Sequence, residues 1–196
     1  MVFQDIEGNY WIGLYGEGIS MLTSFAFSYY TPGKNSLENN VLYVNSFKDK
    51  YILGTPTGFH LFDPVIGKSV SFTDLNSQVG KTEITSFYLD QENNLWIGTG
   101  GNGLFVRNSS GSVRLFYRSG DSGADFINDI EMDDRNIWLA TLNGVIVLDR
   151  SSGKDKNRYN INNGLPHNSI NKIFIARDGN TYIGTESERL YWIDHD

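Results

Sequence analysis

The chain has 196 residues, of which 39% are hydrophobic and 14% aromatic, and its formal net charge is −7 at pH 7. This length can bury roughly 70% of the unfolded surface, and the 20% of charged residues form no long polar run, so disorder is not expected. The negative charge argues against nucleic acid and anionic membranes as partners, because both bind clustered Lys and Arg. No cysteine is present, which excludes disulfide and thiol chemistry.

One short phrase recurs five times along the chain: a large aromatic or aliphatic residue, an Ile or Leu, and then Gly or Ala. The Gly or Ala stands at positions 13, 54, 98, 140 and 184, so the spacings are 41, 44, 42 and 44 residues. A steady period in this range indicates stacked structural units. The copies are Trp11-Ile12-Gly13, Ile52-Leu53-Gly54, Trp96-Ile97-Gly98, Trp138-Leu139-Ala140 and Tyr182-Ile183-Gly184.

Each unit contains short runs rich in β-branched and aromatic residues, separated by polar turns, a pattern typical of antiparallel strands. In the two clearest units these runs are 84–89, 95–99, 104–107 and 113–116, then 127–132, 136–141, 144–149 and 157–161. Four such strands per ~40–50 residues form one blade of a β-propeller, with the recurring phrase on the second strand. The sequence therefore predicts an all-β propeller of about four and a half to five four-stranded blades and no substantial helix. The predicted blades are 1–40, 41–83, 84–126, 127–169 and 170–196.

The first unit begins inside its first strand, and the last unit stops at the end of its third strand. Because terminal repeats need caps, this pattern favours a segment of a larger propeller. The alternative is a complete five-bladed ring with degenerate end blades. The segment interpretation leaves an open strand edge and apolar end faces, so it also predicts a homo-oligomer in which terminal blades meet.

The recurring aromatic residues are expected to pack between blades, because they repeat with the period of the fold. Asp, Asn and Gly recur in the turn before each second strand, where they favour turn formation. Trp192, in a third strand, is also expected in the core. The recurring aromatic residues are Trp11, Trp96, Trp138 and Tyr182.

Three segments resemble the two-component regulator propeller repeat: Asp5–Gly13, Asp90–Thr99 and Asn163–Ile170. In that family the repeats form large propellers in the periplasmic sensor region of hybrid two-component proteins, and many of these sensors respond to glycan fragments. The resemblance thus implies a periplasmic sensor module, without membrane contact by this segment, whose neighbours are further blades or domains of the same sensor. It covers nearly the whole chain and departs most in the second unit, where Ile52 replaces Trp.

The sequence offers little for catalysis or metal binding. Its histidines, His60, His167 and His195, have no cysteine or nucleophile motif to work with, so neither a catalytic triad nor a zinc site is expected. We expect a binding module that is not an enzyme and uses no cofactor. A propeller enzyme of the lyase or lactonase kind, and a purely structural interaction propeller, remain the alternatives.

Loops at one end of a propeller carry ligand sites in many members of the fold, because a rigid scaffold presents them together. The loops between second and third strands and between blades offer amides, carboxylates and aromatic rings, which suit an oligosaccharide and equally a protein partner. In the last of these loops Glu186 and Glu188 have no counterparts in the other units, and Arg189 breaks the local glycine pattern beside them. The candidate ligand-binding residues are Tyr15, Glu17, Asn102, Phe126, Asn143, His167, Asn168, Glu186, Glu188 and Arg189.

Overall fold

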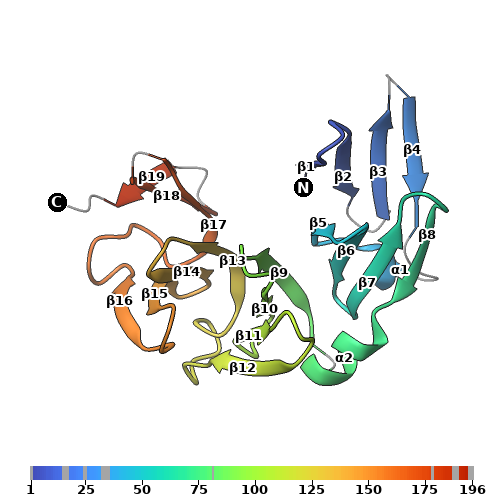
Figure 1. Ribbon diagram of the computed structural model, residues 1–196. Coiled ribbons are helices and arrows are strands. Elements are labelled where there is room, and N and C mark those ends of the chain that lie inside the picture. Colours follow the sequence, from blue (N-terminus) through green and yellow to red (C-terminus); the bar gives the residue numbers. More distant parts are fainter. Residues whose placement is uncertain are drawn as a thin grey trace. The chain divides into compact units, whose positions relative to one another are not determined.

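The computed structural model describes residues 2–14, 18–23, 26–31, 36–80, 82–177, 179–186 and 190–193 (Figure 1). It divides into two compact units, residues 1–85 and 86–196, and each is treated by itself below. No helix in the described part of the chain is long and apolar enough to cross a lipid bilayer.

The first unit contains two four-stranded antiparallel sheets and two short helices. In each sheet the strands follow one another in chain order. The first sheet is β1 (Val2–Gln4), β2 (Tyr10–Leu14), β3 (Gly18–Thr23) and β4 (Ala26–Tyr30); the second is β5 (Tyr43–Phe47), β6 (Lys50–Thr55), β7 (Gly58–Asp63) and β8 (Lys68–Ser71). The helices are α1 (Ser36–Asn39) and α2 (Thr73–Val79).

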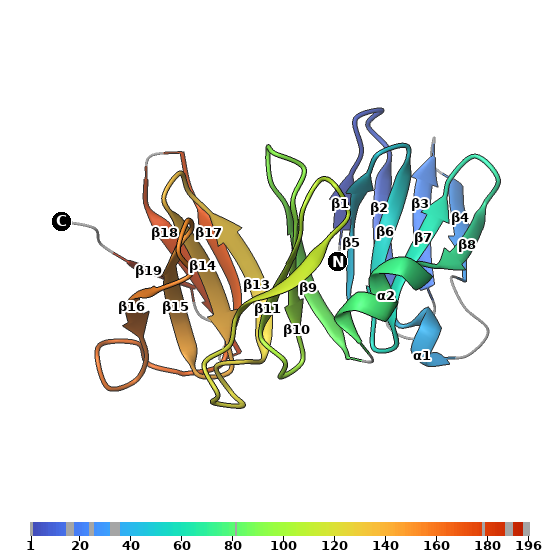
Figure 2. The ribbon, with the colours of Figure 1, turned by 60° about the horizontal axis from the view of Figure 1, so that its bottom comes forward.

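The second unit contains three further sheets with the same order (Figures 1 and 2). The first of them starts with β9, which spans the boundary between the units. The sheets are β9 (Ile84–Leu89), β10 (Leu95–Thr99), β11 (Leu104–Arg107) and β12 (Val113–Tyr117); β13 (Ile127–Met132), β14 (Asn136–Thr141), β15 (Gly144–Asp149) and β16 (Asp155–Tyr159); and β17 (Ile170–Ile175), β18 (Thr181–Thr185) and β19 (Leu190–Ile193). We number the five sheets as blades 1 to 5 in chain order.

These sheets confirm the all-β propeller class and place the recurring phrase where it was predicted. Residues 12, 53, 97, 139 and 183 all lie on the second strand of a blade, β2, β6, β10, β14 and β18. The helices are only four and seven residues long. One boundary differs: the fourth strand of blade 4 is Asp155–Tyr159 and so begins two residues before the predicted run.

Successive blades pack through two faces of different character. In blade 4, Trp138, Ala140 and Val147 lie on one face, and that face is covered by Ile173 and Ile183 of blade 5. The same arrangement joins blade 3 to blade 4 and blade 1 to blade 2. We call the two surfaces the tryptophan face and the aliphatic face of a blade.

The glycine of the recurring phrase allows this close approach. A Cβ atom at Gly98 would lie 2.2 Å from Ser86 Oγ and 2.8 Å from Ile127 Cγ2 on the neighbouring blade. Since Ser86 also donates a hydrogen bond to the carbonyl of Ile127 over 3.0 Å, even a methyl group would separate two blades that are bonded to each other there.

An aspartate carboxylate holds each of the three core tryptophans, and in blade 3 that carboxylate is buried. The indole Nε1–H of Trp96 donates to Asp90 Oδ2 over 2.9 Å, and Asn94 Nδ2 donates to the same oxygen over 3.0 Å. Asp90 Oδ1 accepts the backbone N–H groups of Glu92 and Asn94. We call this arrangement the Asp–Asn–Trp clamp.

The clamp recurs with the same geometry in two other blades. Its indole distance is again 2.9 Å for the pairs Trp11–Asp5 and Trp138–Asp133. Burial by itself would raise the pKa of Asp5, but the hydrogen bonds from Trp11 and Asn9 lower it to about 2. The Asp5 carboxylate is therefore ionised at neutral pH.

Burial of the aromatic residues agrees with the prediction for three tryptophans and not for the fourth. Trp11, Trp96 and Trp138 are 1%, 5% and 4% exposed, whereas Trp192 is 67% exposed. The prediction that Trp192 belongs to the core was wrong, because its side chain lies on the tryptophan face of blade 5, which no described residue covers. Tyr182, on the same face, is only half-buried.

We expect Trp96→Ala and Trp138→Ala each to lower the free energy of unfolding by about 3–5 kcal/mol, since each removes a large buried aromatic group. Trp192→Ala is the matched control and should cost less than about 1 kcal/mol. Urea unfolding followed by far-UV circular dichroism measures all three. A small loss at Trp96 or Trp138, comparable to that at Trp192, would contradict the packing role.

Candidate functional site

The candidate ligand residues fall into two groups. Tyr15, Glu17, Glu188 and Arg189 lie outside the described residues, as does His195. The other six candidates all lie in the second unit, at the end of the blades where second strands lead into third strands. They are Asn102, Phe126, Asn143, His167, Asn168 and Glu186. We call this end the loop end.

Backbone hydrogen bonds join the segments that carry these residues. Gly103 N–H donates to the carbonyl of Asp125 over 3.1 Å, which ties the turn of blade 3 to the connection that carries Phe126. Gly144 N–H donates to the carbonyl of Asn168 over 2.6 Å, and Glu186 N–H donates to the carbonyl of Ser169 over 3.4 Å. The structure thus gathers the described candidates on one connected set of loops.

Two of the candidates use side-chain atoms to hold those loops. Asn143 Nδ2 donates to Asp121 Oδ1 over 3.3 Å, and Asn168 Oδ1 accepts the backbone N–H of Ile161 over 3.0 Å. His167 and Glu186 are exposed, and Phe126 is half-buried. Each of these two side chains thus makes a hydrogen bond within the loop end, and its contact with a ligand stays a prediction.

A hollow of the second unit lies at the other end of blades 3 and 4 from these loops. We call it the Trp96 hollow; its volume is about 550 Å³, within the range of small-ligand sites. It borders the Asp–Asn–Trp clamp of blade 3 and the third-to-fourth-strand turn of blade 4. Its lining residues are Asp90, Glu92, Asn94, Trp96, Val106, Asn108, Arg114, Phe116, Asp134, Arg135, Asp149, Arg150, Ser151 and Lys156.

An aromatic pair and a stacked arginine form one wall of the Trp96 hollow. The rings of Trp96 and Phe116 meet edge to face with centroids 4.7 Å apart. The guanidinium of exposed Arg114 lies 4.9 Å from the centre of the Phe116 ring, a cation–π distance. This wall offers an apolar surface beside a charged donor.

Ion pairs from blade 4 form the opposite wall. Arg150 Nη2 lies 3.2 Å from Asp90 Oδ2 and 3.8 Å from Glu92 Oε1, and Lys156 Nζ lies 3.4 Å from Asp149 Oδ2. Burial favours a raised pKa for Asp90, but the hydrogen bonds from Trp96 and Asn94 outweigh it and lower the pKa. Hydrogen bonds from Ser151 and Ser152 lower the pKa of Asp149. Both carboxylates are therefore anionic acceptors at neutral pH.

A second hollow, of about 650 Å³, lies beside Trp11 in the first unit. It borders the clamp of blade 1, as the Trp96 hollow borders that of blade 3, and it includes Asp5 and Asn9. This hollow differs from the Trp96 hollow in the residues of its turns, because exposed Ile6 and Val65 contribute apolar side chains to it. Sequence reasoning missed both hollows because it assigned these turn residues to turn formation alone.

Metal-binding geometry is not found in the described part of the chain, where no three His, Asp or Glu side chains converge on one point. His60 is buried on β7, whereas His167 is exposed at the loop end.

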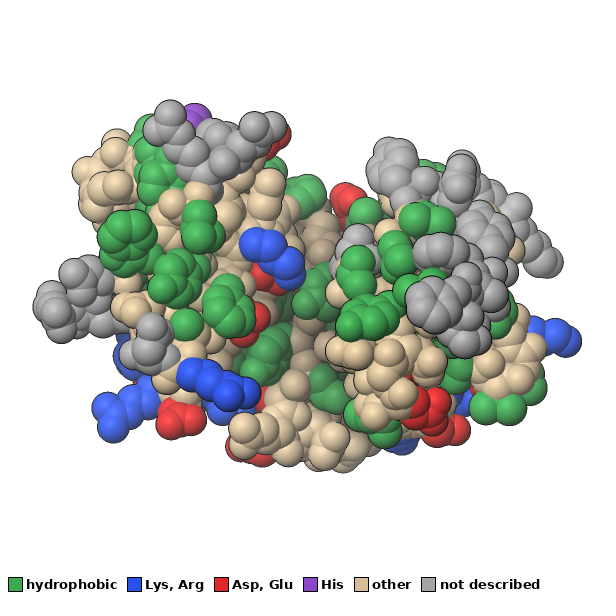
Figure 3. All heavy atoms as spheres, turned by 90° about the horizontal axis from the view of Figure 1, so that it is seen from above, with side chains coloured by type: hydrophobic (Ala, Val, Ile, Leu, Met, Phe, Trp, Pro, Cys, Tyr) green, Lys and Arg blue, Asp and Glu red, His purple; other side chains and the backbone are tan. Residues whose placement is uncertain are grey.

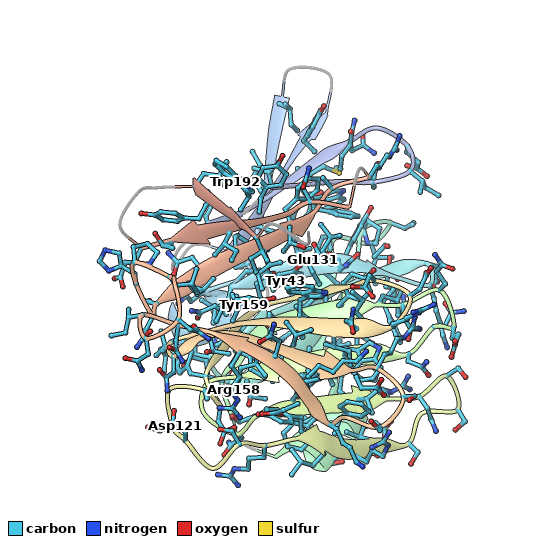
Figure 4. The ribbon with its side chains drawn as sticks, turned by 90° about the vertical axis from the view of Figure 1, so that its left-hand side faces the viewer. Tyr43, Asp121, Glu131, Arg158, Tyr159 and Trp192 are labelled. Carbon is cyan, nitrogen blue, oxygen red and sulfur yellow. The ribbon has the colours of Figure 1, made fainter. Side chains whose placement is uncertain are left out.

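One acidic residue between blades 4 and 5 titrates near neutrality. Half-buried Glu131 lies opposite Trp138 across β13 and β14 and is labelled in Figure 4. Burial, and then the nearby Asp129, raise its pKa to about 7, although Lys172 acts in the opposite direction. Asp129 itself is buried and binds Lys172 Nζ over 2.7 Å and Ile173 N–H over 3.0 Å. The junction between these blades thus contains two carboxyl groups and one amine.

Residues 79–101 and 164–187 match the family model described as two component regulator propeller, which confirms the resemblance in those segments. No curated protein matches the chain in sequence.

Several solved propellers share its fold. Two structures of the extracellular domain of BT4673 from B. thetaiotaomicron, one assigned to a hybrid two-component system and one to a one-component system, are 22% and 21% identical with TM-scores of 0.74 and 0.76; they match 94% and 96% of this chain. The WD40 propeller of Doa1 is 14% identical with a TM-score of 0.76 over 99% of this chain and 62% of its own. The present chain spans about a quarter of the BT4673 chains, 25% and 26%. At these identities the likeness shows the fold alone.

We expect Glu131→Gln to make stability less dependent on pH. The pKa of Glu131 in the folded protein, about 7, lies above its ordinary value of 4.5. The contribution of Glu131 to the free energy of unfolding is therefore fully present below pH 4.5 and is lost as the pH rises through 7. At pH 8 the variant should be more stable than the wild type by about 1–3 kcal/mol.

The check is urea unfolding at half-unit steps from pH 4 to pH 8. Glu92→Gln is the control, because its side chain is 75% exposed. If Glu131→Gln and the wild type differed by the same amount at pH 4 and pH 8, burial of an ionisable Glu131 would be disproved.

Proposed function

We propose that the chain is a ligand-binding propeller segment of a two-component sensor that acts outside the cytoplasmic membrane. The observation that carries this proposal is the match of residues 79–101 and 164–187 to the two component regulator propeller family. The fold likeness to the extracellular domain of BT4673 agrees with it. The first matched segment includes Asp90 and Trp96, so the clamp of blade 3 lies in the matched part of the chain. Most residues that line the Trp96 hollow lie outside the two matched segments.

A short oligosaccharide is the ligand class that we propose, and the Trp96 hollow is its proposed place. A sugar presents an apolar ring face and several hydroxyl groups, which need an aromatic or stacked surface and paired donors and acceptors. Phe116 with Arg114 supplies the first requirement, and exposed Glu92, Asp134 and Arg135 supply the second.

Binding without turnover is the proposed outcome. Glycoside cleavage uses a carboxylic acid whose raised pKa keeps it protonated. In the hollow, Asp90 and Asp149 both have lowered pKa values, so neither is suited to donate a proton at neutral pH. A signal then requires that the ligand bind two arrangements of the sensor with different affinity.

The proposal is tested by isothermal titration calorimetry of the purified chain against neutral and acidic oligosaccharides. For any that binds, Arg114→Gln and Glu92→Gln are expected to weaken affinity by about 10-fold or more, as removal of a hydrogen bond to a charged group does. Glu186→Gln at the loop end is the matched control for Glu92→Gln and should leave affinity unchanged. Circular dichroism confirms that each variant folds.

Three results would contradict the proposal. Loss of affinity in Glu186→Gln but not in Glu92→Gln would move the site to the loop end. Absence of binding by the whole panel would favour the purely structural alternative, and release of reducing ends would favour an enzyme.

A further inference from the structure

The hollow beside Trp11 in the first unit repeats the Trp96 hollow at an earlier place in the chain, and we call it the Trp11 hollow. Nine of its fifteen lining residues stand 85 positions before a lining residue of the Trp96 hollow. Among them, Asp5, Glu7 and Trp11 correspond to Asp90, Glu92 and Trp96. The hollow lies between two four-stranded sheets and is therefore a feature of the repeat itself.

Three turns at one end of the first unit form the rim of the Trp11 hollow (Figure 2). They join β1 to β2, β5 to β6 and β7 to β8. Ile6, in the first turn, is fully exposed, and Val65, in the third, is 89% exposed. Other apolar side chains are also exposed, and Figure 3 shows several on the surface that faces the viewer. Ile6 and Val65 differ because they border a volume of about 650 Å³, which is within the range of small-ligand sites.

Aromatic rings form one wall of the Trp11 hollow. The ring centroids of Trp11 and Tyr51 are 4.4 Å apart, and Phe3 meets Tyr51 edge to face at 5.9 Å. The indole N–H and the Tyr51 hydroxyl both donate to Asp5 Oδ2 over 2.9 Å. Because the polar atoms of these rings bind the clamp carboxylate, the rings present apolar surface to the hollow.

The chemistry of the two hollows differs at one pair of corresponding positions. Val65 stands where the Trp96 hollow has Arg150, whose Nη2 atom lies 3.8 Å from Glu92 Oε1. None of the described residues that line the Trp11 hollow is an arginine. The exposed carboxylate of Glu7, which corresponds to Glu92, therefore faces an apolar side chain and no guanidinium.

The polar groups at the rim suit hydroxyl groups. Glu7 and Asp49 are exposed carboxylates, and Lys48 is an exposed amine. The ammonium of Lys50 binds Asp63, which lies outside the hollow. Carboxylates accept hydrogen bonds from hydroxyl groups, and an ammonium donates to them. Since charges of both signs stand at the rim, an uncharged ligand fits it better than an ion of either sign.

We propose that the Trp11 hollow is a second ligand site, which binds an uncharged amphipathic molecule with an aromatic group joined to a hydroxyl-rich part. The aromatic group lies against Phe3, Ile6 and Val65. The hydroxyl groups donate to the carboxylates of Glu7 and Asp49. The Trp11 and Trp96 hollows share no lining residue, so this site does not depend on the ligand proposed for the Trp96 hollow.

Isothermal titration calorimetry of the full chain with phenyl β-glucoside tests the proposal, and methyl β-glucoside is the matched probe without an aromatic group. Phenyl β-glucoside should bind at least about 10-fold more tightly, because only its ring buries apolar surface against the rim. Ile6→Ser and Val65→Ser should each weaken the binding of phenyl β-glucoside by about 10-fold, since each removes part of that surface.

Two further variants complete the test. Ile66→Ser is the matched control, because Ile66 is 63% exposed on the same turn as Val65 but does not line the hollow; it should leave the affinity unchanged. Val65→Arg introduces the residue type of the Trp96 hollow, so it should weaken binding at least as much as Val65→Ser. The unfolding midpoint of each variant shows that it is folded.

The proposal is overturned if phenyl β-glucoside does not bind, or binds no more tightly than methyl β-glucoside. Equal weakening by Ile66→Ser and Val65→Ser would overturn it as well, since the contact would then not be specific to the hollow. If Arg114→Gln weakened binding while Ile6→Ser and Val65→Ser did not, the probe would occupy the Trp96 hollow. That result would overturn this inference and support the proposed function.

Discussion

One hydrogen bond, from an indole N–H to the carboxylate of an Asp five or six residues earlier in the same hairpin, organises blades 1, 3 and 4. In blades 1, 3 and 4 the Nε1–H group of the tryptophan donates to an Asp Oδ2 at the same 2.9 Å. The carboxylate closes the turn with its other oxygen, so a single Asp fixes both the hairpin and the orientation of the ring. A ring held in this way presents a constant surface, and that constancy allows blades of different sequence to stack.

The clamp also connects one blade to the next. In the first unit Tyr51 of blade 2 donates its hydroxyl to Asp5 over 2.9 Å, and in the second unit Arg150 of blade 4 reaches Asp90 at 3.2 Å. Blade 2 lacks the tryptophan, and Ile52 fills its place at 0% exposure. In that blade an ion pair between Lys50 and Asp63 joins the second strand to the third. Hollows lie beside the clamps of blades 1 and 3.

The repeat could be predicted from the sequence because its chemistry is local. The five second strands and the burial of three tryptophans could be predicted from three local signals. These signals are the alternation of apolar residues, Asp and Asn in the turns, and a Gly where two blades approach each other. The hydrogen bond between Asp and Trp was not predicted, because the Asp was assigned to turn formation and the Trp to packing between blades. Its signal was present in the spacing, since the Asp precedes the Trp by six residues in blades 1 and 3 and by five in blade 4.

Features that depend on neighbouring surfaces could not be predicted in the same way. Trp192 stands at a position that the alternation along its strand assigns to the core. Its burial requires a neighbouring blade, and the alternation within one strand does not show whether such a blade covers it. The hydrogen bonds that the side chains of Asn143 and Asn168 make to other loops could not be predicted from the sequence either. The Trp96 hollow depends on Arg150 and Lys156 of the following blade, which are distant from Trp96 in sequence.

A double-mutant cycle between Asp133 and Trp138 is the most direct test of the clamp. The free energies of unfolding of the wild type, Asp133→Ala, Trp138→Phe and the double variant would be measured in urea at pH 7. If the indole–carboxylate bond organises the hairpin, the two substitutions should be coupled by about 1.5–3 kcal/mol, the scale for a hydrogen bond to a charged group. Effects that add to within about 0.3 kcal/mol would show that ring and carboxylate act independently and would contradict this account.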